Sequence, residues 1–100
     1  MKGFSGNIEK FTLENDNFRQ VLYTAKHCQL VLMSLPVGGE IGSEVHEEND
    51  QFFRFESGEG KVLIDGNEYA VSDGSAIIVP AGAEHNVINT GEEPLKLYTI

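Results

Sequence analysis

Apolar side chains along this chain come in short runs, and turn-forming residues separate one run from the next. No long window keeps apolar residues at positions i, i+3, i+4 and i+7, so the pattern does not predict helices. Short runs rich in β-branched and aromatic residues, bounded by Gly, Pro, Asn and Asp, are typical of strands. The expected strands are residues 19–24, 29–35, 44–46, 51–57, 61–64, 68–70, 76–79, 85–89 and 95–99. Many short strands at regular spacing predict an all-β sandwich or barrel.

The chain has 100 residues, which is enough for one small domain of the usual size, about 100–150 residues. Residues 1–17 are more polar than the rest, and we expect a loosely attached N-terminal arm with at most one edge strand. Residues 18–100 are then expected to form the single folded domain.

The most specific motif is the stretch from Gly74 to Asn89, with the spacing G-x5-P-x-G-x2-H-x3-N. Its glycines and Pro80 fix turns on either side of an apolar run, and they place His85 at a set point on a strand. This spacing resembles the second conserved motif of the cupin superfamily, where the His is a metal ligand.

The first cupin motif, G-x5-H-x-H-x3,4-E-x6-G, has an altered counterpart upstream. The matching residues are Gly38, Glu44, His46, Gln51 and Gly58, so Glu replaces the first His and Gln replaces the usual Glu. The resemblance implies a small single-domain cupin, of the cupin 2 or mannose-6-phosphate-isomerase-like type. The fold it implies is a double-sheet jelly-roll barrel.

The resemblance also implies a metal site formed by Glu44, His46, Gln51 and His85. Side chains two apart on a strand share a face, so Glu44 and His46 project together, and Gln51 shares the parity of Phe53. Two imidazoles and one carboxylate suit Fe(II), with Mn, Ni or Zn as competing divalent ions. Gln is a weak ligand, so we expect a lower affinity than in a site with three His and one Glu.

The third ligand has an alternative in Asp50, which follows His46 by the shorter spacing that the family motif allows. Asp50, however, leaves seven residues before Gly58 and has the opposite parity to Phe53. The pattern favours Gln51.

Seven Lys and Arg against sixteen Asp and Glu give a net charge of −9. An acidic surface repels phosphate backbones and anionic lipids, so we expect neither nucleic acid nor a membrane as partner. No apolar segment approaches the roughly 18 residues of a membrane helix, and because residues 1–10 contain no apolar run we expect no secretory signal. The single cysteine, Cys28, is expected in the core, and a cytoplasmic location is expected.

Family resemblance alone does not fix a function. The first hypothesis is a small metalloenzyme that acts on a small oxygen-bearing substrate by dioxygenase-, lyase- or isomerase-like chemistry. The alternatives are a non-catalytic module that binds a small molecule or a stabilising metal, and a cupin that has lost its metal. No Lys or Arg clusters near the ligands in the sequence, which gives little support to a sugar-phosphate isomerase.

A homodimer is also expected, because members of this family commonly exchange sheet edges and unpaired edges favour pairing. The nearly continuous apolar run from Leu30 to Met33 predicts a strand that is covered on both faces, and a second subunit could provide one cover.

Overall fold

Antiparallel strands account for most of the computed structural model, which describes residues 2–100. The elements are α1 (Ile8–Glu14), β1 (Arg19–Thr24), β2 (Gln29–Leu35), β3 (Glu44–Val45), β4 (Gln51–Ser57), β5 (Gly60–Ile64), β6 (Asn67–Val71), β7 (Ala76–Val79), β8 (Glu84–Asn89) and β9 (Leu95–Thr99). Every expected strand is present, and the observed ends lie within one residue of the predicted ones. The predicted all-β class is therefore confirmed.

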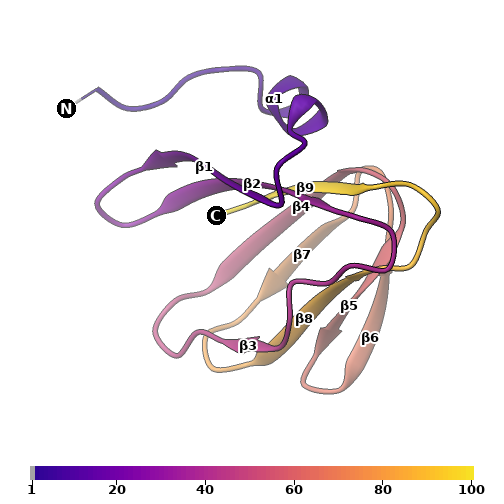
Figure 1. Cartoon of the computed structure of the whole chain (residues 1–100). Helices are drawn as coiled ribbons and strands as arrows, with labels where there is room; N and C mark the ends of the chain where they lie inside the picture. The colour runs from indigo at the N-terminus through magenta and orange to yellow at the C-terminus, as the bar shows by residue number, and fades with distance from the viewer. Residues whose placement is uncertain (1) are drawn as a thin grey trace.

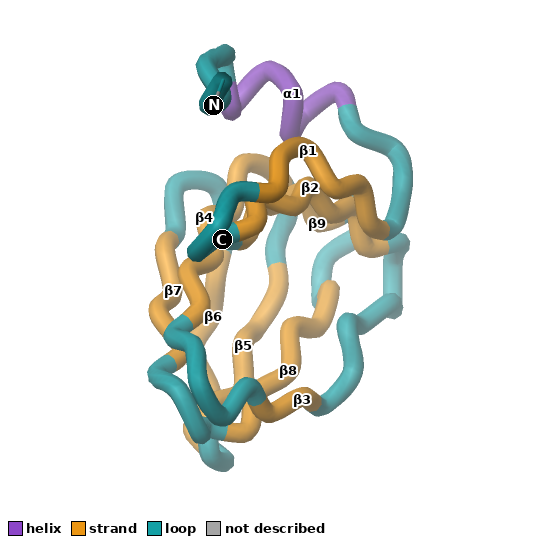
Figure 2. Tube along the Cα trace, turned by 90° about the vertical axis from the view of Figure 1, so that its left-hand side faces the viewer, coloured by secondary structure: helices purple, strands orange, loops and turns teal. Residues whose placement is uncertain are grey.

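The strands form two facing sheets, one of five strands in the order β1-β2-β9-β4-β7 and one of four in the order β3-β8-β5-β6 (Figures 1 and 2). This is the double-sheet jelly roll that the motifs imply. Hydrogen bonds between strands run within each sheet, so the two sheets do not close into one continuous barrel. In the described residues, no helix is long and apolar enough to cross a membrane.

The core lies between the sheets and follows from the alternation of side chains along each strand. Phe53 and Phe55 point inward from β4 and are 1% and 0% exposed, against Val62 and Val87 of the other sheet. Burying a side chain of this size contributes about 1.5–3 kcal/mol. The inward positions of both sheets thus hold the layers together.

A short helix, and no edge strand, occupies the segment before β1. Asn7 caps helix α1 by accepting a hydrogen bond from the Lys10 backbone N–H at 3.0 Å. Thr12 is fully buried, and α1 contacts β2, β4 and β9 on the outer face of the five-stranded sheet (Figure 1). The sequence did not predict this helix, because a helix of seven residues is too short to show periodicity and is stabilised by packing. The division at residue 17 stays a prediction.

Strand β2 is covered on both faces, as its apolar run predicts. Val31 and Met33 belong to the core between the sheets, whereas Leu32, which is 4% exposed, lies on the opposite face. Helix α1 contacts β2 on that side, so a segment of the same chain contributes the outer cover (Figure 1). Homodimerisation stays a prediction.

Glu56 is a buried acid on β4. Sequence parity predicts that Arg54 and Glu56 point away from the interior, but only Arg54 is open to solvent: the side chains are 38% and 4% exposed. The Glu56 carboxylate lies 3.3 Å from the Arg54 guanidinium. Burial raises the pKa of Glu56, Arg54 opposes this rise, and Glu9 and Asp73 add to it.

Replacing Glu56 with Gln should stabilise the fold more at pH 7 than at pH 5. When folding raises the pKa of a carboxyl, the fold loses stability as the pH rises. The loss begins near the pKa of the unfolded state, about 4.3, and is complete above the pKa of the folded state. Below the unfolded value both states are protonated and the penalty vanishes. Urea unfolding at the two pH values checks this, with the exposed Glu68→Gln as control. The prediction would be contradicted if the wild type were more stable than Glu56→Gln and the difference in the free energy of unfolding grew with pH.

Candidate metal centre

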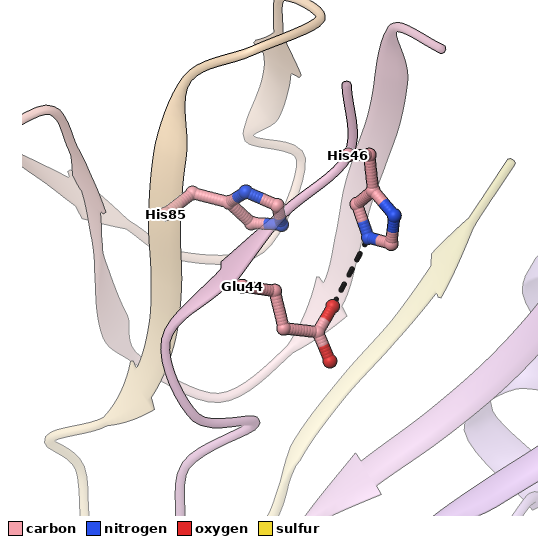
Figure 3. A group of neighbouring side chains, drawn as sticks. All are labelled: Glu44, His46 and His85. Atoms are coloured by element: carbon pink, nitrogen blue, oxygen red, sulfur yellow. Dashed lines mark hydrogen bonds and ion pairs between the residues drawn. The ribbon is translucent and has the colours of Figure 1, made fainter. Parts of the chain in front are cut away.

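Three potential metal ligands converge where β3 meets β8. The antiparallel register places Glu44 directly opposite His85, and His46 follows Glu44 by two residues on the same side. One ligand atom from each of Glu44, His46 and His85 lies within 4.8 Å of the other two. Figure 3 shows the His85 ring on β8 pointing toward the other two side chains. Residues from both motifs therefore meet at one point.

The turn of the second motif holds the segment that carries the first. The Gly82 N–H donates to the His46 carbonyl at 2.8 Å, and the Ala81 N–H donates to Asp50 Oδ1 at 2.9 Å. Gly82 adopts φ +86°, which favours glycine at this point of the turn. Asp50 thus binds the turn backbone, and the structure does not bring it into the group of three.

The surroundings of His85 favour the tautomer that a metal ligand requires. The residue is 2% exposed, and Nδ1 donates to the Ala83 carbonyl at 3.4 Å. A neutral imidazole with its proton on Nδ1 has a free lone pair on Nε2. That Nε2 atom is buried and has no hydrogen-bond partner within residues 2–100. Because an unsatisfied buried polar group costs about 1–3 kcal/mol, this atom fits a site that receives a ligand.

Glu44 and His46 complete a donor set suited to a divalent transition metal. Glu44 Oε2 and His46 Nε2 form a hydrogen bond of 3.1 Å, so the two groups already lie side by side and a metal would replace the proton between them (Figure 3). Both side chains are partly exposed, at 43% and 45%, so the site is open on this side. Two imidazoles and one carboxylate are typical of non-haem Fe(II) sites and are also compatible with Mn, Ni or Zn.

Gln51 lines a cavity together with Glu44, His46 and Phe53. Its Nε2 donates to Thr99 Oγ1 at 2.9 Å, which fixes the plane of the amide. Its Oε1 is buried and has no partner in the part of the chain that the structure describes. The structure thus places Gln51 beside the same cavity, as its parity predicts, and its role as a ligand stays a prediction.

The cavity has a volume of about 1050 Å³, and its second wall is the β1–β2 hairpin. Arg19, Lys26 and His27 line this wall, although they lie far from the ligands in the sequence. Cys28 is also there and is exposed, so its predicted place in the core was wrong. It belongs to the bend between the strands, where alternation does not apply. The missed signal for this wall was a long stretch, residues 17–39, without Asp or Glu.

The family model of the Cupin domain matches residues 31–100. The chain belongs to the cupin family. The match includes both motifs and every strand from β3 to β9, so the resemblance read from the motif spacing is confirmed.

The relatives of this cupin extend the similarity but leave its activity open. Bacillus subtilis YrkC, an uncharacterized protein, is 50% identical over 105 residues, which cover 99% of this cupin and 56% of YrkC. The crystal structure of BH2720 from Bacillus halodurans has a TM-score of 0.96 and 45% identity over 98% of this cupin and 79% of that chain.

A mannose-1-phosphate guanylyltransferase of Klebsiella pneumoniae is 27% identical over 63 residues, which are 63% of this cupin and 13% of that protein.

Proposed function

We propose that this cupin is a small metalloenzyme that acts on a small oxygen-bearing substrate. The metal would be held by Glu44, His46 and His85, with Gln51 as a weaker fourth donor. The observation that carries the proposal is the convergence of the three ligand atoms around a buried, unpartnered His85 Nε2. A chance cluster of surface acids would not contain a buried imidazole whose Nε2 has no hydrogen-bond partner within residues 2–100.

A divalent ion held here would supply Lewis acidity to a substrate oxygen or, as Fe(II), the means to activate O₂. Three or four protein donors leave open positions for the substrate. The residues of the chain position and enclose the reacting groups. Ala83 orients His85, Thr99 orients the Gln51 amide, and Phe53 forms an apolar part of the cavity wall.

The test is metal loading of protein purified without an affinity tag, followed by chelation and re-addition of Fe(II), Mn, Ni or Zn. One of these ions should bind at about one per chain. At a free concentration 100 times Kd it should stabilise the fold by about 2.7 kcal/mol, which raises Tm on the order of 10 °C. No bound ion and no gain in stability would refute the proposal. Metal binding without turnover of any oxygen-bearing substrate would favour the non-catalytic binding module.

Replacing Gln51 with Glu should tighten metal binding at least about tenfold, because a full negative charge replaces an amide dipole beside the ion. Asn49→Asp is a matched control, since Asn49 also lines the cavity and gains the same charge. If both variants bind metal more tightly than the wild type by the same factor, the gain comes from added negative charge anywhere in the cavity and not from direct coordination. The role of Gln51 as a direct donor would then be refuted. Equilibrium dialysis measures both affinities.

A further inference from the structure

The charges of this chain are distributed unevenly. All sixteen acids lie outside residues 17–39, and this stretch carries Arg19, Lys26 and His27. The stretch includes the β1–β2 hairpin, which forms one wall of the cavity. The cavity of a chain with net charge −9 therefore has a wall that is locally positive.

Arg19 is exposed, but it lies on the inner face of its sheet, where it lines the cavity. It pairs in register with Met33, a core residue of β2, so both side chains lie on the inner face of the sheet. Arg19 Nη2 donates to Gln29 Oε1 at 3.3 Å, and Gln29 Nε2 donates to Thr24 Oγ1 at 2.9 Å. Arg19, Thr24 and Gln29 all line the cavity, so this chain of hydrogen bonds orients the guanidinium along its wall.

Within residues 2–100, neither Arg19 nor Lys26 has an acidic partner. Arg54, Lys61 and Lys96 each form an ion pair, whereas Arg19 and Lys26 form none among residues 2–100. Unpaired cations in a strongly acidic chain are available to bind an anion.

The rest of the cavity lining includes acidic residues. They would repel an anion, so an anion in the cavity would bind at the β1–β2 hairpin. Glu44, Glu48 and Asp50 line the cavity from the segment between β3 and the start of β4, and β3 belongs to the sheet that faces the one with the hairpin. Glu44 contacts His46, and Asp50 accepts from the backbone of Ala81. The basic and the acidic residues that line the cavity thus belong to different segments of the chain.

We propose that the cavity binds a small organic carboxylate, held at its carboxylate end by Arg19 and Lys26, with a second oxygen directed to the metal group. The planar guanidinium offers two parallel donors that match a carboxylate. This inference rests on the proposed function, because the metal group sets the other end of the ligand.

The experiment titrates metal-loaded protein with lactate and with propane-1,2-diol, which has the same skeleton without the charge. Lactate should bind, and the diol at least about tenfold more weakly. The double variant Arg19→Gln and Lys26→Gln should weaken lactate binding at least about tenfold and leave metal affinity within about twofold. The control is Lys2→Gln with Lys10→Gln, which removes the same charge away from the cavity and should keep lactate affinity within about twofold.

Metal loading, measured first by equilibrium dialysis, separates the two proposals. No metal binding by the wild type refutes the proposed function. Metal binding with equal affinity for lactate and the diol, or with unchanged lactate affinity in the cavity variant, overturns the carboxylate site alone. Inorganic phosphate that binds as tightly as lactate would also overturn it, since the wall would then select charge and not carboxylate geometry.

Discussion

Replacing His85 with alanine should lower metal affinity at least about a hundredfold. Loss of an outer partner of a metal ligand already costs 10–100-fold, and His85 is a direct donor in the proposed site. The variant removes the one buried imidazole of the group and leaves Glu44 and His46, both partly exposed and hydrated. Two solvated donors cannot hold an ion as three converging ones do.

Equilibrium dialysis with the metal that loads the wild type measures this loss, and His27→Ala is the matched control. His27 lines the cavity but lies outside the group of three, so its loss should change affinity less than about threefold. Because His85→Ala also opens a hole in the core, His46→Ala is needed as a second variant. His46 is partly exposed, so its loss should reduce metal affinity with little change in the stability of the metal-free protein. Full metal binding by His46→Ala and His85→Ala would refute the site.

The position of these ligands could be predicted because local rules decide it. Glu44 and His46 share a face by strand alternation. The turn at Gly82 leads into β8, which carries His85 and pairs with β3. The same rules predict the inward position of Phe53 and Phe55. In each of these cases the information lies within a few residues.

Features that depend on long-range packing could not be predicted in this way. Helix α1 is stabilised by the outer face of a sheet whose strands come later in the chain. Arg19 lines the same cavity as Glu44 only because β1 joins the edge of that sheet. The burial of Glu56 likewise follows from elements that its parity does not reveal. Strand alternation gives the face of a side chain but not what covers that face.

Replacing Asn89 with alanine should destabilise the fold by about 3 kcal/mol or more. The residue is 3% exposed, and its Nδ2 donates to the carbonyls of Leu35, Pro36 and Glu93 at 3.0, 3.2 and 2.8 Å. Its Oδ1 accepts from the Gly91 N–H at 2.9 Å. Alanine would remove four hydrogen bonds to backbone groups that are buried or partly buried, and a group left without any partner costs about 1–3 kcal/mol. For a domain of this size Tm should fall by roughly 10–20 °C.

Asn86→Ala is the control, because the same substitution on the same strand removes contacts to Gly42 and Glu40 at a partly exposed position. It should cost about 1 kcal/mol, and urea unfolding compares the two variants. At low temperature, where Asn89→Ala is still folded, its metal affinity should stay close to that of the wild type. The second cupin motif would then combine two separate tasks, with His85 binding the ion and Asn89 joining three segments of backbone. A metal affinity that falls in Asn89→Ala as far as in His85→Ala, or a loss of stability no larger than in Asn86→Ala, would contradict this division.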